Sequence, residues 1–298
     1  MNDAPLLAAD DLRIDVGGAI AIERASFATR GNSVALLGDE HGILSALGGS
    51  AQIRAGALRV LGVDVADGAH LRSNQVAIAP LDPPIPPRWT ALEYLTWGAR
   101  LAGEGKAAAA RDASAALTEF GLESASGQAV ESLSLIERRV LVLAQAVLAK
   151  PAVLVAPAPL AGLGGREAAY VASAWTQASR GRKWIVSLSN LYLGSAESTL
   201  AQSADDLLLF ASGSLVRQGK LERLENGAVG YTVTVRSRAP ELKAALLSRG
   251  IELTGGPLRF FVELPPEMKA QDLLSLSADV GAPIVELVPR IPLGEGRP

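Results

Sequence analysis

Short apolar runs alternate with segments of helical spacing through most of this chain, and this alternation limits the fold more than any other feature. Apolar runs that predict buried strands occur at residues 33–38, 57–61, 76–79, 152–156 and 183–187. Apolar residues recur every three or four positions, as in helices, at 43–49, 90–101, 106–120, 135–150 and 166–180. Because strands joined through helices run parallel, the pattern predicts an α/β fold with a largely parallel sheet and helices around it.

The flanks of this region have different patterns. Residues 11–29 carry apolar runs around the turn signal Gly17-Gly18 and predict a β-rich opening. The proline-rich stretch at 80–87 excludes a regular element. Residues 206–218 predict a hairpin.

Beyond Asn226-Gly227 the pattern predicts a second, smaller module with the element order β-α-β-α-β. At about 65 residues, this module is near the lower size limit for independent folding. The predicted division is a main domain at 1–225 with a helical subdomain at about 85–150, a small α+β C-terminal domain at 229–290, and a tail at 291–298.

Composition excludes several classes of site. The chain has no cysteine, which rules out disulfides, zinc–thiolate sites and thiol nucleophiles. Its two histidines, His41 and His70, are too few for a multi-histidine metal site, and both are expected at the surface. The formal net charge is -3, and no basic stripe suits a nucleic acid. We therefore expect no metal, no cofactor and no nucleic-acid partner.

Two further expectations concern the surroundings of the protein. No apolar run approaches the roughly 18 residues that would span a membrane, and residues 1–10 do not resemble a signal peptide. A cytoplasmic location is expected, with any contact to the membrane made through a membrane protein. The aromatic residues Trp89, Tyr94 and Trp97 are expected to pack within the core or the helical subdomain, with a partner-facing surface as the alternative because interfaces favour aromatic residues.

Five segments in a fixed order carry a resemblance to a known family. They are VALLG at 34–38, VAIAPL at 76–81, LSLIERRV at 133–140, PAVLVAPAPLAGLG at 151–164 and VSLSNL at 186–191. Together they resemble the ATP-binding subunits of ABC-type transporters, in particular the exporter subfamily with a small C-terminal appendage. The resemblance implies a P-loop ABC-ATPase-like core with a β-rich subdomain, a parallel sheet core and a helical subdomain.

The first segment resembles the strand that enters the phosphate loop. A family member would continue with a glycine-rich loop ending Gly-Lys-Ser/Thr, which holds phosphates through backbone N–H groups and the lysine charge. Here the residues that follow Gly38 are only Asp39, Glu40, His41 and Gly42, so that about four residues are missing before the helix. The two carboxylates would repel phosphate. An ungapped alignment would place Leu44 and Ser45 at the lysine and hydroxyl positions, and the lysine is absent in either case.

The second and third segments have lost other nucleotide contacts of the family. Leu81 stands where the resemblance implies a glutamine that senses metal and nucleotide. Ser134 matches the signature Leu-Ser-Gly-Gly-Gln, but Leu135 and Ile136 replace its two glycines. Glycines permit a close approach of the backbone to phosphate, and leucine and isoleucine would obstruct it.

The fourth and fifth segments lack the residues that the resemblance implies for catalysis. Pro157 occupies the position of the magnesium-linked aspartate, Ala158 that of the catalytic glutamate and Gly164 that of the next aspartate. Hard cations need oxygen ligands, and hydrolysis needs a group that positions water. Ser189, or Asn190 with a shift of one residue, stands at the position of the switch histidine.

Fold alone does not dictate function, but the losses fall on nucleotide-handling positions while the apolar pattern survives. The leading hypothesis is a catalytically inactive ABC-ATPase-like subunit, a pseudo-ATPase. It would be a structural or regulatory partner of a membrane transporter complex, bound to a transmembrane permease subunit, to an ATPase-competent or identical ABC subunit, or to both. The alternatives are a weakly ATP-binding motor subunit of a heteromeric ABC exporter and a soluble scaffold or regulator unrelated to transport.

Overall fold

The computed structural model describes residues 4–38, 42–73, 75–189, 191, 194–211, 213–224, 229–265 and 267–290. The chain divides into two compact units. One unit comprises Met1–Ser189 with Leu200–Lys220, and the other comprises Asn190–Thr199 with Leu221–Pro298.

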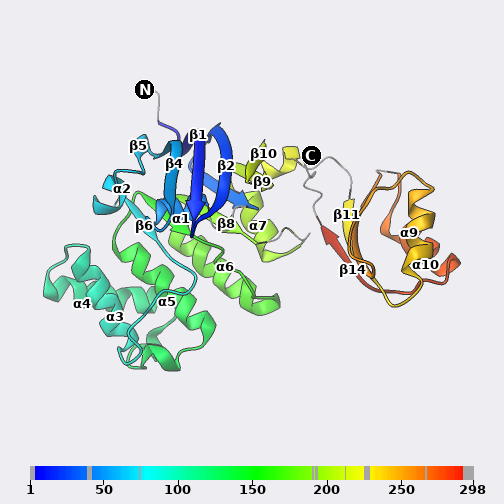
Figure 1. Cartoon of the computed structure of the whole chain (residues 1–298). Coiled ribbons are helices and arrows are strands. Elements are labelled where there is room, and N and C mark those ends of the chain that lie inside the picture. The colour runs from blue at the N-terminus through cyan, green and yellow to red at the C-terminus, as the bar shows by residue number, and fades with distance from the viewer. Residues whose placement is uncertain are drawn as a thin grey trace. The chain divides into compact units, whose positions relative to one another are not determined.

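The first unit is built on a mixed sheet with the strand order β5-β4-β1-β2-β10-β9-β3-β8-β7-β6 (Figure 1). Its parallel part consists of β3 (Ser33–Leu37), β6 (Val76–Ile78), β7 (Val153–Ala156), β8 (Lys183–Leu188) and β9 (Asp206–Ala211). Every residue of β3 and β7 is buried, as strands covered on both faces require. The predicted α/β class with a parallel sheet core is confirmed.

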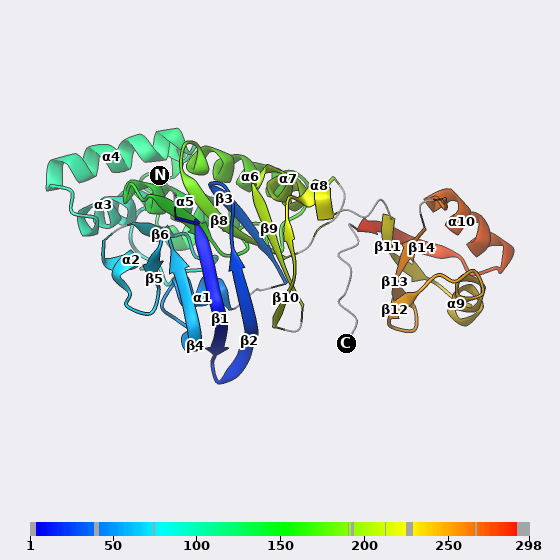
Figure 2. The same cartoon turned by 90° about the horizontal axis from the view of Figure 1, so that it is seen from above.

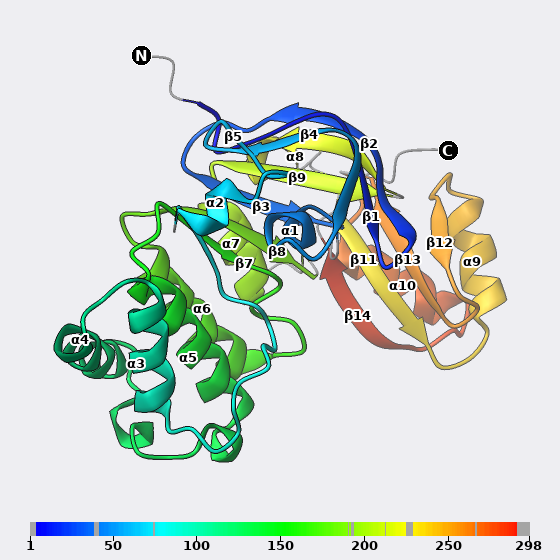
Figure 3. The ribbon, with the colours of Figure 1, turned by 60° about the vertical axis from the view of Figure 1, so that its left-hand side comes forward.

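The remaining strands form the β-rich flank, which Figure 2 shows from above. They are β1 (Leu7–Val16), β2 (Ala19–Ala28), β4 (Gln52–Val60), β5 (Val63–Asp64) and β10 (Ser214–Gly219). Strands β1 and β2 join through Gly17 and Gly18, whose positive φ angles of 57° and 89° cost glycine little. Figure 3 shows α1 (Ile43–Leu47) between the β1–β4 flank and β3, and its apolar side chains belong to the same buried cluster.

The helical subdomain consists chiefly of α3 (Ala91–Leu101), α4 (Lys106–Glu119) and α5 (Leu135–Leu148), and α3 packs against both of the others. Thr90 and Ser134 cap α3 and α5 as predicted, each within a capping box. The proline-rich stretch at 80–87 has no helix or strand, also as predicted. Further helical elements of the chain are α2 (Ala69–Arg72), α6 (Gly165–Ser179), α7 (Ala196–Ser203) and two 3-10 turns at Glu123–Ala125 and Val130–Ser132. Helix α8 (Leu221–Leu224) belongs to the second unit.

The second unit contains an antiparallel sheet in the order β12-β13-β11-β14. Its elements are β11 (Val229–Val235), α9 (Ala239–Leu247), β12 (Leu253–Gly255), β13 (Arg259–Leu264), α10 (Ala270–Asp279) and β14 (Ile284–Arg290). Both helices cover one face, where Val233, Leu242 and Phe260 are buried (Figure 1). The predicted order β-α-β-α-β was wrong because the three-residue strand β12 adds a hairpin; so short a strand shows no alternation in the sequence.

Two expectations about single residues were also wrong. His70 is not at the surface: it is 1% exposed, and its Nε2 lies 2.9 Å from the Leu47 carbonyl oxygen. Trp97 is 46% exposed, and its ring forms an edge-to-face pair with that of Trp89, at 5.5 Å between centroids. Tyr94 is buried as expected, donates to Gln145 Oε1 at 3.1 Å, and has its pKa raised to about 12 by burial.

Candidate functional site

The parallel strands β3, β6, β7 and β8 end at one edge of the sheet, which is where ligands bind in open α/β folds. A cleft of about 550 Å³ lies at this edge. The structure brings four predicted positions into its lining, namely Leu81 after β6, Pro157 and Ala158 after β7, and Ser189 after β8. The rest of the lining is Leu44, Ser45, Gly48, Ser50, Ile78, Pro80 and Ala161.

No charged side chain is among these lining residues. The polar side chains in the described lining are those of Ser45, Ser50 and Ser189. A cation about 4 Å from a phosphate contributes roughly 4 kcal/mol at the effective dielectric constant near a protein surface, or about a thousandfold in affinity. Nothing in this lining supplies that attraction. In the described part of the chain, moreover, no three His, Asp or Glu side chains cluster as a metal site would require.

The segment between β3 and α1 is short. Gly38 has a φ of 79°, and a Cβ on it would collide with the carbonyl oxygen of Phe210 on β9. Asp39, Glu40 and His41 lie outside the described residues. Gly42 precedes α1 without any side-chain cap, and α1 has 5 residues, of which Ile43, Leu44, Ala46 and Leu47 are buried. A helix of little more than one turn has few aligned peptide dipoles to attract an anion.

Comparison with known proteins identifies the architecture. No family model and no curated protein matches the chain. An ATP-binding subunit of an ABC transporter superposes with a TM-score of 0.60 and 23% identity, covering 74% of this chain and 92% of that one. CbiO1 from Clostridium perfringens, part of the ABC transporter complex CbiONQ, superposes with a TM-score of 0.60 and 17% identity. The match covers 73% of this chain and 89% of CbiO1. The ADP conformation of MJ1267, an ATP-binding cassette of an ABC transporter, superposes with a TM-score of 0.59 and 16% identity. The match covers 72% of this chain and 91% of MJ1267.

The chain has the ABC-ATPase fold. All of these solved structures are ABC ATP-binding subunits, and the likeness confirms the fold that the five sequence segments predicted. The cleft lies at the carboxyl ends of the central strands. The motif positions that would form the nucleotide site of a family member were expected at this edge of the sheet.

Not every predicted position reaches the cleft. Gly164 is the N-terminal flanking residue of α6, with φ at -137° and open space where a Cβ would lie. Leu135, 43% exposed, and Ile136, half-buried, lie on α5 and are not part of the cleft lining. Asn190 lies outside the described residues.

Ser134 has a structural role in the ABC-ATPase fold of this chain. Its Oγ donates to Glu137 Oε2 at 2.7 Å and accepts from the Glu137 N–H at 3.2 Å. Hydrogen bonds from the Ser134 side chain and backbone lower the pKa of Glu137. The carboxylate therefore stabilises the start of α5 at neutral pH, and this contribution is lost as the pH falls through the lowered pKa.

Ala158, at the position expected for the catalytic glutamate, has an unusual backbone. Its φ is 40°, in the left-handed region that side chains with a Cβ disfavour. Its N–H donates to Ser187 Oγ on β8 at 2.8 Å, which fixes the end of β7 beside the cleft. Sequence analysis missed Ser187, because nothing in the sequence links it to a residue 29 positions earlier.

We expect Ala158→Gly to stabilise the protein by about 0.5–1 kcal/mol. Relief of the left-handed strain is worth about 1–2 kcal/mol and exceeds the added entropy of the unfolded chain, about 0.4–1 kcal/mol. Ala161→Gly is the matched control, because Ala161 lines the same cleft and is not among the residues with positive φ. It should lose stability in urea denaturation. Equal losses in both variants would contradict the strain at Ala158.

Proposed function

We propose that this protein is a non-hydrolysing ABC-ATPase-like subunit, which acts as a structural or regulatory partner in an ABC-type membrane transporter complex. The observation that carries the proposal is that no charged side chain occurs among the described residues lining the cleft where this fold would hold a nucleotide. Transfer of a phosphoryl group depends almost entirely on positioning and on electrostatic stabilisation by cations and metal ions. The described lining offers neither a cation nor a carboxylate that would hold Mg²⁺.

The residues at the carboxyl ends of β6 and β7 support the loss of hydrolysis. Leu81 and Ala158 have no oxygen or nitrogen in the side chain, and Pro157 lacks even a backbone N–H donor. These residues cannot ligate a metal ion or orient an attacking water through their side chains. The short helix α1 also removes most of the dipole that such a site would direct at phosphate.

A permease partner on the cytoplasmic side of the membrane is part of the proposal. The structural neighbour CbiO1 is part of a transporter complex, and this chain retains the same fold. Among the described residues, none of the helices has the length and hydrophobicity to span a membrane. The helical subdomain presents Trp97 and Leu101, which are 46% and 65% exposed on α3. Exposed tryptophan is a common anchor of protein interfaces, and we place the permease contact there.

Two measurements test the proposal. The purified protein with ATP and Mg²⁺ should release no phosphate above the level of a buffer blank, whereas an intact ABC ATP-binding subunit assayed in parallel should turn over. Undiminished turnover that a substitution in the cleft abolishes would refute inactivity.

The partner is tested by affinity purification from native membranes and identification of the captured proteins by mass spectrometry. The unmodified chain should capture a membrane permease. Trp97→Ser should lower this yield, and Tyr170→Ser, at a tyrosine that is 45% exposed on α6, should leave it unchanged. Capture of soluble proteins alone would favour a scaffold outside transport. Equal yields of permease from the two variants would show that the permease does not bind through Trp97 on α3.

A further inference from the structure

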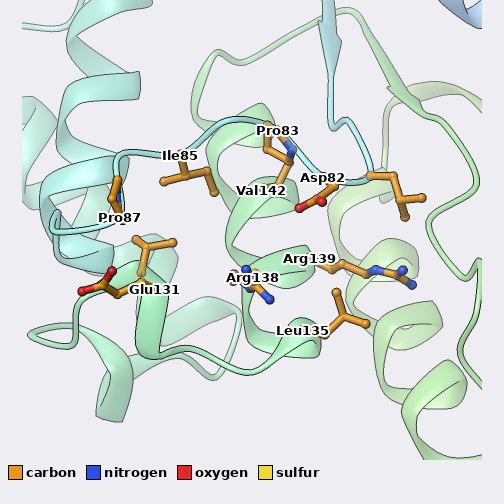
Figure 4. Close-up of a pocket in the computed structure, with 11 residues that line it drawn as sticks. Asp82, Pro83, Ile85, Pro87, Glu131, Leu135, Arg138, Arg139 and Val142 are labelled. Atoms are coloured by element: carbon orange, nitrogen blue, oxygen red, sulfur yellow. The ribbon is translucent and has the colours of Figure 1, made fainter.

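A second cavity, of about 120 Å³, lies between the proline-rich stretch and the start of α5 (Figure 4). Its walls are largely apolar, and its charged lining residues are Asp82, Glu131, Arg138 and Arg139. Neither the cleft nor the proposed function uses these arginines.

The guanidinium groups of Arg138 and Arg139 differ in their hydrogen-bond partners. Arg139 Nη1 donates to the Pro159 carbonyl at 3.2 Å; burial lowers the pKa of Arg139, and the negative charge of Asp82 partly offsets this. Arg138 has no hydrogen bond or ion pair from its side chain within the described part of the chain. Its Nε is buried without a partner, as is the Nε of Arg139. A buried donor without an acceptor costs free energy, and a charged one costs more.

Nearby acidic groups do not neutralise Arg138. Asp82 acts on Arg139. Glu131 is exposed, and Figure 4 shows its carboxylate turned away from Arg138, while the Arg139 guanidinium extends to the opposite side. No ion pair joins Glu131 to Arg138 among the described residues. The guanidinium group of Arg138 therefore has no anionic partner among the described residues and is available to a ligand.

We propose that this cavity binds a small oxyanion, a carboxylate or phosphate group, held by the guanidinium group of Arg138. The guanidinium presents parallel N–H donors that match the oxygens of both groups. Apolar walls formed by Pro83, Ile85 and Val142 limit the access of water and strengthen such bonds. The volume admits an ion of a few heavy atoms and no nucleotide. This site is separate from the cleft and does not depend on whether the protein hydrolyses ATP.

The test is calorimetric titration of the full chain with inorganic phosphate and with acetate, each at constant ionic strength against chloride. At least one oxyanion should bind saturably where chloride does not, and the stronger of the two identifies the preferred group. Arg138→Gln should weaken binding by about tenfold or more, the factor that hydrogen bonds to a charged group provide. Arg166→Gln, at an exposed arginine on α6, should leave binding unchanged.

Two further readouts separate binding from a structural role. Without an oxyanion, Arg138→Gln should be at least as stable as the unmodified protein, since it removes a buried Nε–H donor that has no acceptor. Glu131→Gln should tighten binding by removing a repelling carboxylate from the cavity. The proposal is overturned if no oxyanion binds above chloride, if Arg138→Gln retains full affinity, or if Arg138→Gln unfolds more readily in the absence of ligand.

Discussion

Trp175→Ala lowers the free energy of unfolding of the first unit by about 3–5 kcal/mol. Trp175 lies on α6 and is 1% exposed. Its ring meets the edge of Trp184 on β8, at 5.8 Å between centroids and 85° between planes. Truncation removes this contact between α6 and the parallel sheet and leaves a cavity that the rigid strands cannot fill.

The measurement is urea denaturation followed by circular dichroism. Tyr170→Ala is the control, because Tyr170 lies on the same helix and is 45% exposed. Both substitutions raise helix propensity by a similar amount, because Trp and Tyr rank close together below Ala, and the loss in Tyr170→Ala should stay below about 1 kcal/mol. If Trp175→Ala lowered the free energy of unfolding no more than Tyr170→Ala does, the packing of Trp175 against the sheet would not stabilise the protein in the way described.

Gly38→Ala destabilises the protein by roughly 3 kcal/mol or more. A left-handed φ of 79° costs an L-residue about 1–2 kcal/mol. The new Cβ would also collide with the Phe210 carbonyl oxygen, so that the end of β3 or β9 must shift. A backbone displacement in the centre of a packed sheet belongs to the class of substitutions with the largest losses.

The control for Gly38→Ala is Gly164→Ala. Gly164 has a φ of -137° and open space where a Cβ would lie. Its substitution should change stability by no more than about 0.5 kcal/mol. Similar losses in the two variants would contradict the close approach at Gly38. If the difference is as large as expected, Gly38 is required by the close approach of β9, and its presence is no sign of phosphate binding.

Local signals allowed much of the fold to be predicted from the sequence. The capping boxes at Thr90 and Ser134 involve residues only three positions apart, so their pattern is visible without the fold. The buried strands were predictable because strands covered on both faces are continuous apolar runs, as in β3. The ABC-ATPase fold was predicted from the resemblance of five ordered segments to that family, beginning with VALLG at 34–38.

Features that depend on distant contacts could not be predicted. His70 is buried because α2 packs where its ring meets the carbonyl of Leu47, 23 positions away. The strand β12 exists through its pairing with β13 and has only three residues of its own. For these elements tertiary contacts, and not local propensity, decide the structure.

The candidate site was predictable in part. Leu81, Pro157, Ala158 and Ser189 meet at one cleft because the ends of parallel strands share an edge, which the strand pattern already implied. The positive φ of Ala158 and its bond to Ser187 were not visible in the sequence, since they depend on the pairing of β7 with β8. The expected shortening of the loop at Asp39–His41 stays a prediction.

The most direct test is titration of the pure protein with ATP and Mg²⁺ by calorimetry, followed by a crystal grown in the same mixture. We expect no saturable heat of binding and no nucleotide in the cleft, since the described residues of its lining include no cation to hold a triphosphate. ATP bound with Mg²⁺ against the segment from Gly38 to Ser45 would contradict the account.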